Sequence, residues 1–415
     1  MVRILALLAA LSIATASAMP GGAAPAPPHP DPKLRAMERF SKGDYLEPIE
    51  MLEQAAFDSS GKVVDNMAYQ MWYQLRPMMG GYAPPQPLGA TSPPLAAADS
   101  ARLRAASAHD ALPAIRAEAA KTRIVILNEA HHSPRDRAFG LDVARTLRPL
   151  GYNILAAEAF ANLDGEGESA VNRLEREGYP HLQTGHYLHD PVFADFIRQA
   201  LALGFRPRAY EQKSSQSSPG GGISEREQAQ AENLAAILAA NPGAKIFIYV
   251  GFSHVMEAPV AGNGRAVEWM AARLKKMTGV DPLTIDQAYL GESSQRRSGR
   301  EAQAIVAPRI RGASVLRLGG AYVKVGEYAH AVDLQIFQPG TQLVQGRPIW
   351  LARMGRTAHA VPANLRPSKG RRLVQAFLAN EGEGAIPIDQ VLAEAGKPVP
   401  ILMLPERPVR YAVQD

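Results

Sequence analysis

The chain has 415 residues, of which 46% are hydrophobic and 20% charged, so it can bury a substantial core in one large domain or two moderate ones. It contains no cysteine, which excludes disulfide bonds, a thiol nucleophile and a thiolate metal site. The net charge is only +5, and the Arg/Lys clusters at 296–300 and 369–372 lie beside Gly, Ser and Pro. Without interleaved aromatic residues or a basic helix, these clusters do not indicate a nucleic-acid surface, so we expect no nucleic-acid partner.

Residues 1–18 have the features of a secretory signal peptide. A short basic start and an apolar run lead to Ala16-Ser17-Ala18, which is an A-x-A cleavage site. The apolar run is shorter than the ~20 residues that span a membrane, and no later stretch is long and apolar enough to do so. We therefore expect a secreted or periplasmic protein with no transmembrane segment in the mature chain. Residues 19–32 follow as a disordered Pro/Ala-rich leader.

Residues 33–99 are predicted to form a helical arm and a linker. LEPIEMLEQAAF and NMAYQMWYQLRP place large apolar side chains at helical intervals. Such a stripe indicates packing against the main domain rather than a cofactor site. A Pro/Gly/Ala stretch at 79–99 then separates the arm from the rest of the chain.

Strands and helices alternate through residues 100–290. The apolar runs lie at 123–132, 153–158, 205–211 and 245–254, and the predicted helices at 135–148, 190–203, 224–240 and 264–277. Ser224 with Glu227 has the spacing of a capping box for the third of these helices. The alternation predicts an α/β fold, with a mainly parallel sheet flanked by helices. Beyond residue 290, short β-type runs with Pro/Gly turns predict a β-rich C-terminal extension or subdomain over 291–415.

Acidic and imidazole side chains follow the predicted strands at the point where each strand ends. Glu129, His131 and His132 follow the first strand, Glu158 ends the second, and His254 follows the most hydrophobic one. The carboxyl ends of parallel strands meet at one edge of a sheet, so we expect these residues to lie together as a polar site.

Four further residues are candidates for the same site. Tyr210 and Glu211 end another strand, ahead of a polar, Gly-rich loop suited to be a lid. Arg226 opens the next helix and could pair with carboxylates or with an anionic or carbonyl group of a ligand. His186, in a His-rich segment, could form a substrate-side wall or contact a metal or haem.

The set of motifs resembles the erythromycin esterase / ChaN haem-binding lipoprotein / TraB–Tiki superfamily over roughly residues 120 to 290. The first motif is similar to G-E-A-x-H, with Glu129 at the acid position and Asn128 in place of glycine, and Glu158 matches the glutamate after the next strand. Gly251-x-x-His254 resembles the closing G-x-x-H.

The helix that follows the Gly-rich loop carries a second part of the resemblance. SEREQAQAENLAAIL is similar to R-D-x-x-M-A-x-N of the esterases, matching at Arg226, Ala231 and Asn233. Glu227 stands in for Asp, and Gln230 for Met. The esterase register puts the key histidine at His132, whereas the ChaN and Tiki register puts it at His131. We favour His132, because this helix is closer to the esterases.

The resemblance implies an esterase-like hydrolase acting on a small-molecule ester, lactone or amide. A histidine held by a glutamate would take a proton from the attacking water, while a second histidine or Arg226 stabilises the oxyanion. Two alternatives stay open on cofactors. Glu129, His131 and His254 could hold a divalent metal that activates the water. The ChaN relatives instead imply a non-catalytic haem- or metal-binding protein that uses the histidines and Tyr210.

Overall fold

The computed structural model describes residues 31–80, 93–165, 167–259, 267–292 and 294–415. The predicted signal peptide and almost all of the predicted leader lie outside these residues. Within the described part of the chain, none of the helices combines the length and hydrophobicity needed to cross a bilayer.

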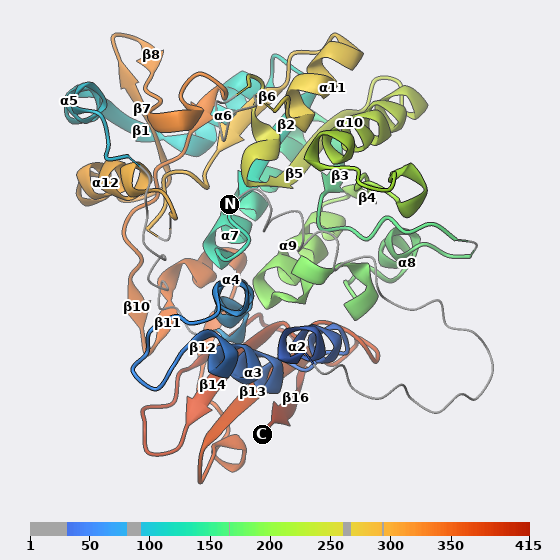
Figure 1. Ribbon diagram of the computed structural model, residues 1–415, viewed down its shortest axis with the longest axis vertical. Coiled ribbons are helices and arrows are strands. Elements are labelled where there is room, and N and C mark those ends of the chain that lie inside the picture. The colour runs from blue at the N-terminus through green and yellow to red at the C-terminus, as the bar shows by residue number, and fades with distance from the viewer. Residues whose placement is uncertain (1–30, 81–92, 166, 260–266, 293) are drawn as a thin grey trace.

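A six-stranded parallel sheet forms the centre of the molecule and confirms the predicted α/β class (Figure 1). Its strand order is β4-β3-β5-β2-β6-β9. The strands are β2 (Ile124–Glu129), β3 (Tyr152–Ala157), β4 (Arg206–Arg208), β5 (Lys245–Gly251), β6 (Leu283–Asp286) and β9 (Leu334–Gln335). Strands β3, β5 and β2 are neighbours in all-parallel register, so the residues that follow them emerge at the same edge.

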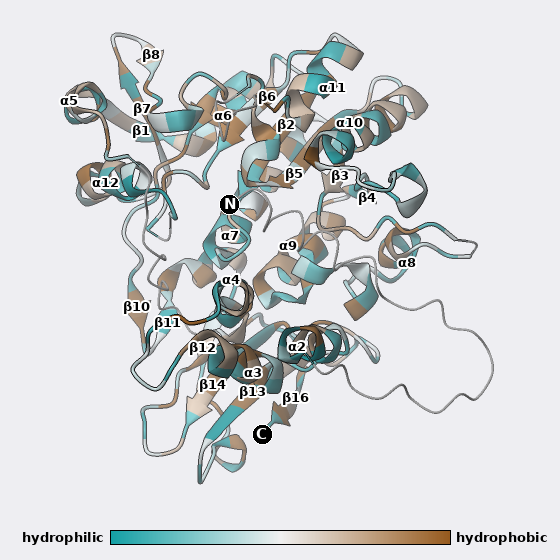
Figure 2. Ribbon diagram, in the orientation of Figure 1, coloured by the Kyte–Doolittle hydropathy of each residue, from teal (hydrophilic) through white to brown (hydrophobic). Residues whose placement is uncertain are grey.

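Helices cover both faces of this sheet, which explains why its central strands are apolar throughout. Val125 and Leu127 of β2 join the core beneath α6 (Ala111–Ala119), α7 (Pro134–Leu147) and α9 (Pro191–Ala202). Ile124 and Ile126 alternate with them and face α10 (Ile223–Ala240) and α11 (Met270–Thr278). The outer helices accordingly have a hydrophobic and a hydrophilic side (Figure 2).

The four predicted helices of this region correspond to α7, α9, α10 and α11, although 264–266 lie outside the described residues. The capping box predicted at Ser224 and Glu227 is wrong. Helix α10 begins at Ile223 after Gly222, without a side-chain cap, and Glu227 is fully buried in the helix's second turn. The carboxylate of Glu227 pairs with His254 instead of capping the helix.

The N-terminal helices lie between the α/β layer and a C-terminal sheet (Figure 1). Helices α2 (Pro32–Ser41), α3 (Leu46–Ala56) and α4 (Asn66–Leu75) share a core with Leu373 of the C-terminal sheet. That sheet is antiparallel, in the order β14-β13-β16. The backbone amides of Tyr45 and Leu46 both donate to the side chain of Gln414 near the C-terminus, at 2.8 and 3.1 Å. The two ends of the described chain thus stabilise one another.

The region after residue 290 contributes to both layers. It supplies β9 to the main sheet. It also supplies β7 (Ser314–Leu318) and β8 (Ala321–Tyr322), which form a separate three-stranded sheet with β1 (Ser107–Asp110) in the order β1-β7-β8. The remaining strands are β10 (Leu343–Val344), β11 (Arg347–Pro348), β12 (Thr357–His359), β13 (Arg371–Leu378), β14 (Asp389–Glu394), β15 (Leu402–Leu404) and β16 (Val409–Gln414). The remaining helices are α5 (Ala97–Ala105), α8 (Ala170–Glu177) and α12 (Arg297–Val306).

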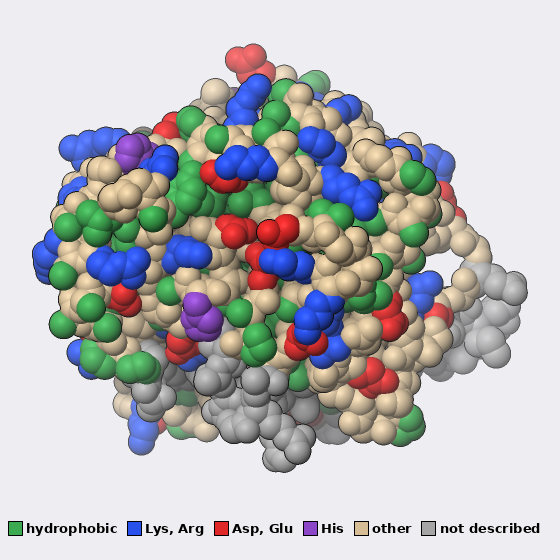
Figure 3. All heavy atoms as spheres, turned by 90° about the horizontal axis from the view of Figure 1, so that it is seen from above, with side chains coloured by type: hydrophobic (Ala, Val, Ile, Leu, Met, Phe, Trp, Pro, Cys, Tyr) green, Lys and Arg blue, Asp and Glu red, His purple; other side chains and the backbone are tan. Residues whose placement is uncertain are grey.

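Basic and acidic side chains are interspersed on the face seen from above the α/β layer (Figure 3). A cavity of about 410 Å³ lies at the opposite end of the molecule, where the turn after α2 meets the C-terminal sheet. Tyr45, Phe377 and Arg410 are among its lining residues. It is therefore separate from the strand ends at which the sequence predicts a site.

Candidate active site at the carboxyl edge of the sheet

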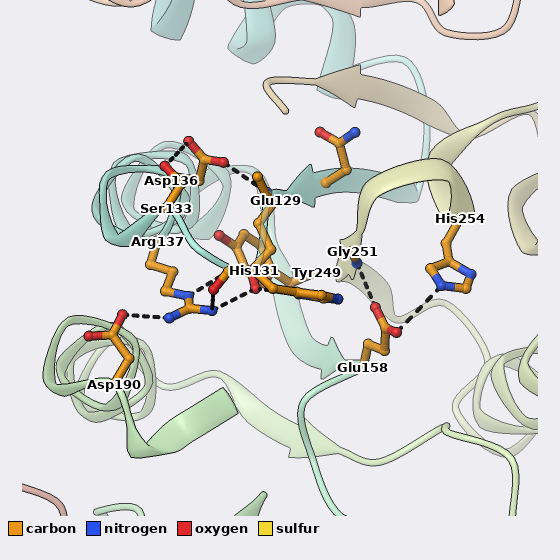
Figure 4. Close-up of polar contacts among 12 residues, drawn as sticks. Glu129, His131, Ser133, Asp136, Arg137, Glu158, Asp190, Tyr249, Gly251 and His254 are labelled. Carbon is orange, nitrogen blue, oxygen red and sulfur yellow. Dashed lines mark hydrogen bonds and ion pairs between the residues drawn. The ribbon is translucent and has the colours of Figure 1, made fainter. Parts of the chain in front are cut away.

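A buried glutamate at the end of β2 holds a histidine. The Nδ1 atom of His131 lies 3.0 Å from Oε1 of Glu129, whose side chain is only 2% exposed (Figure 4). Burial by itself raises the pKa of Glu129, but the Arg137 guanidinium and His131 outweigh this effect and lower it. Glu129 is therefore a carboxylate, which only accepts hydrogen bonds, so Nδ1 of His131 carries the hydrogen. In the neutral ring the lone pair is then on the other nitrogen, Nε2.

Arg137 anchors Glu129 in this orientation. Its Nε donates to Oε2 of Glu129 at 2.9 Å, and its Nη2 donates to Oε1 at 3.0 Å. Nη1 donates to Asp190 at 2.6 Å, and Nη2 also donates to the carbonyl of His131 at 2.8 Å (Figure 4). Because Arg137 and both carboxylates are buried, the pairing satisfies charges that would otherwise be very costly to bury.

The ring of His131 is held on two sides by aromatic residues. It stacks on Tyr187, with ring centroids 4.0 Å apart, and meets Phe252 edge-on at 5.0 Å. The backbone of Phe252 has φ of +42°, a conformation that non-glycine residues rarely adopt. Strain of this kind persists where the surrounding structure enforces it, and it is typical of functional sites.

The loop that carries His131 is fixed by Asp136 in the first turn of α7. Its carboxylate accepts from the amide of Ala130 and from the hydroxyl of Ser133, both at 2.9 Å (Figure 4). Burial raises the pKa of Asp136 to about 7. Asn128, the last residue but one of β2, donates to the carbonyl of Phe252 and to Asp286, both at 2.8 Å. It thus ties the ends of three strands together.

Glu158 faces His131 across the end of β5. Its Oε2 accepts from the amide of Gly251 at 2.5 Å (Figure 4). Gly251 lies between the two side chains, because a Cβ at this position would be 2.6 Å from Nε2 of His131 and 3.0 Å from Oε2 of Glu158. The order β3-β5-β2 is what brings a residue of each strand to this point.

A cluster of charges surrounds the other oxygen of Glu158. Oε1 lies 2.6 Å from Nη2 of Arg226 and 3.4 Å from Nε2 of His254. Arg226 is also paired with Glu211, and Nδ1 of His254 lies 2.8 Å from Oε1 of Glu227. Burial lowers the pKa of His254, but Glu227 and Glu158 outweigh it and raise the pKa to about 10. His254 is therefore an imidazolium at neutral pH.

The structure brings together most of the predicted site residues. Glu129, His131, Glu158, Arg226 and His254 meet at the carboxyl edge, and Glu211 joins them through Arg226. The preference for His132 over His131 is corrected. His131, and not His132, pairs with Glu129, whereas the ring of His132 packs 4.4 Å from Tyr73 of α4 and 6.5 Å from Phe252.

Two predicted substrate-binding residues lie outside the cluster. Tyr210 is fully buried in the core with its hydroxyl 3.4 Å from the carbonyl of Tyr249, so it does not face a ligand. His186 packs against Phe40 of α2 and against His189, with ring centroids 5.3 and 6.2 Å apart. Both positions result from tertiary packing that the local sequence does not reveal.

The three residues considered as metal ligands do not form a coordination sphere. Arg137 and His131 already bind both oxygens of Glu129, and the two ring nitrogens of His254 are paired with Glu227 and Glu158. Across the described residues, no group of three or more His, Asp or Glu side chains has an arrangement suited to hold a metal ion. The donor set therefore does not fit a divalent cation.

Four residues of the site were missed in the sequence. Arg137 and Tyr187 were not singled out, while Asp190 was interpreted only as a helix cap, and Glu227 was assigned to a helix cap and to the Asp position of the esterase-type motif. Asp190 does cap α9, by accepting from the amide of Val192 at 3.1 Å, but it also pairs with Arg137. Glu227 lies on the face of α10 that packs into the core, where a charged side chain requires a partner.

Comparisons with known proteins give only distant structural likenesses. No protein-family model matches the chain, and no characterised protein matches it in sequence. The effector domain RRSP of a MARTX toxin from Vibrio vulnificus is 16% identical, with a TM-score of 0.30 over 55% of this chain and 50% of that structure. A structure described as bacterial protein toxins is 15% identical, with a TM-score of 0.33 over 63% of this chain and 57% of its own.

The C-terminal region of Pasteurella multocida toxin, described as having a thiol-protease-like catalytic triad, is 12% identical with a TM-score of 0.31. The alignment covers 89% of this chain and 61% of that structure. The chain thus spans about half to three fifths of the length of the structures that it matches. A thiol nucleophile is excluded here, because this chain has no cysteine.

Proposed function

We propose that the protein is a hydrolase of the erythromycin esterase / ChaN / TraB–Tiki kind that acts on an ester, lactone or amide of a small molecule. The observation that carries the proposal is the pair of Glu129 and His131. Glu129 holds Nδ1–H of His131, which leaves Nε2 as a base beside Glu158. A histidine oriented in this way by a carboxylate is the arrangement of a general base.

The reaction follows from the charges at the site. Nε2 of His131 takes a proton from water while the water oxygen bonds to the carbonyl carbon, and the carbonyl oxygen takes up the displaced electron pair. Arg226 and the His254 imidazolium lie side by side, with Nη1 3.2 Å from Nε2, and stabilise this developing negative charge. Collapse breaks the bond to the leaving oxygen or nitrogen, which takes a proton from His131.

The substrate would enter on the side of Arg226 and Glu211. Their side chains are 18% and 24% exposed, whereas those of Glu158 and His131 are 7% and 6% exposed. General-base catalysis contributes about 10²–10⁴-fold, so the charges around the oxyanion must supply much of the remaining acceleration.

The test is turnover by the purified protein on panels of activated esters, lactones and amides, with and without a chelator. We expect turnover that survives the chelator and falls about 10²-fold or more in H131Q and E129Q. H109Q, which changes an exposed histidine on β1, is the matched control. Activity that the chelator abolishes and a divalent cation restores would contradict the metal-free mechanism. A Soret band on titration with haem, without turnover on any panel, would favour the ChaN-type binding alternative.

A further inference from the structure

Two consecutive residues of α10 contact opposite nitrogens of the His254 ring. Nη1 of Arg226 lies 3.2 Å from Nε2, and Oε1 of Glu227 lies 2.8 Å from Nδ1. Successive side chains of a helix diverge by about 100°, so Arg226 points to the exposed side of the site while Glu227 points inward. Glu227 is fully buried, whereas the Arg226 side chain is 18% exposed.

Glu227 is itself held in place from the far side. Its Oε2 accepts from the amide of Met270, the first residue of α11, at 2.7 Å. The ring of Trp269 meets His254 edge-on at 5.8 Å and closes the remaining side. Helix α10, helix α11 and the turn after β5 therefore fix the relative positions of Glu227 and His254.

We propose that Glu227 is a positioning residue that fixes the Nδ1 side of the His254 ring and, together with Glu158 on the Nε2 side, keeps the ring a cation. The kinetic consequence of this role rests on the proposed hydrolysis, whereas the state of the ring does not. Two histidines then divide the chemistry. His131 is the base, and His254 is a fixed positive charge beside the oxyanion that cannot compete for the proton of water.

The charges around His254 support this division. It faces Glu158 from the end of β3, and Arg226 and Glu227 from α10. Arg226 opposes the imidazolium charge and is shared between Glu158 and Glu211, so the His254 ring would face only Glu158 as a counter-charge if Glu227 were neutral. With Glu227 charged, each ring nitrogen of His254 lies within 3.4 Å of a carboxylate oxygen, and burial of the charged ring is compensated.

The variant E227Q tests the proposal without any substrate. The amide oxygen of glutamine can still accept from Met270, but its NH₂ group can only donate toward Nδ1, which favours the neutral ring. We expect the pKa of His254 to fall by about 1–3 pH units, as for loss of one close opposite charge. The measurement is NMR titration of ¹³C-labelled histidine, with the His254 signal assigned by its absence in H254Q.

E232Q is the matched control, because it removes the same charge from an exposed position on the same helix. It should leave the His254 titration unchanged. E227D, which keeps the charge, should restore part of the shift. An unchanged His254 titration in E227Q would overturn the proposal. If E227Q does not fold, the ¹⁵N shifts of the wild-type ring decide, since an unprotonated Nδ1 at neutral pH would also overturn it.

The kinetic test is separate. E227Q should lower kcat more than it changes KM, and the loss should increase as the pH rises through the new pKa of His254. A normal kcat with a shifted His254 titration would contradict the role in catalysis while leaving the positioning role intact. If no panel substrate is turned over, the proposed function fails but the NMR result still stands.

Discussion

The ring of His131 lies directly against the backbone of Gly251. A Cβ on Gly251 would come within 2.6 Å of Nε2 of His131, the atom assigned as the base. The φ of Gly251 is −89°, which any residue adopts, so the requirement for glycine is steric and not conformational. Gly251 therefore limits where the ring of His131 can lie.

G251A should therefore lower kcat strongly. The new methyl group displaces His131, and a misplacement of about 1 Å can cost about 10²-fold in rate. Overpacking of this kind costs about 1–3 kcal/mol of stability, so the variant should still fold. Kinetics with circular dichroism checks both effects. G312A is the control, since a Cβ at Gly312 meets nothing within 4 Å; equal activity in the two variants would contradict the assignment.

The two adjacent histidines should have different effects when replaced. H131Q should abolish turnover, because it removes the base held by Glu129. H132Q should retain most of the turnover and lose stability instead, because His132 packs against Tyr73 at the N-terminal arm. Steady-state kinetics and thermal unfolding of the two variants separate these outcomes. The reverse result would restore the esterase-type register.

Replacing His254 should make the stability of the protein depend differently on pH. The pKa of His254 is about 10 in the folded protein and ~6.5 in an unfolded chain, so the folded state binds the proton more tightly. Its stabilisation is complete below about pH 6.5 and is lost as the pH rises through about 10. The free-energy difference between wild type and H254Q in urea unfolding should shrink over that interval. H359Q, at an exposed histidine of β12, should show no such trend.

Replacing Arg137 should strongly lower the free energy of unfolding. R137M leaves the carboxylates of Glu129 and Asp190 buried without their partner, which costs about 3–5 kcal/mol. R137K should also be destabilised, because lysine cannot reproduce the fork that contacts both oxygens of Glu129. Urea unfolding provides the measurement. R176K, in an exposed pair with Glu168, should change stability by less than about 0.5 kcal/mol.

The parallel sheet and the meeting of its polar strand ends could be predicted because they depend on local patterns. Residues 245–250 are almost entirely apolar, as a strand covered on both faces must be, and the chemistry changes abruptly at Gly251 and His254. Once Glu129, Glu158 and His254 are each placed at a strand end, parallel pairing alone brings them to one edge. The region that contains β9 was predicted as β-rich, but as a C-terminal extension, because no local signal shows that β9 pairs in parallel with β6 of the main sheet.

The sequence by itself determined the α/β class, the positions of α7, α9 and α10, and the residue types at the sheet edge, since hydrophobic period and strand ends are properties of the local chain. Only the tertiary structure decided which of His131 and His132 joins Glu129, and that Glu227 lies against His254 and not at a helix cap. It also decided that the N-terminal helices pack on the C-terminal sheet through Leu373. These outcomes depend on which surfaces pack together and on which buried charges pair between segments that are distant in the chain. A local sequence pattern does not contain this information.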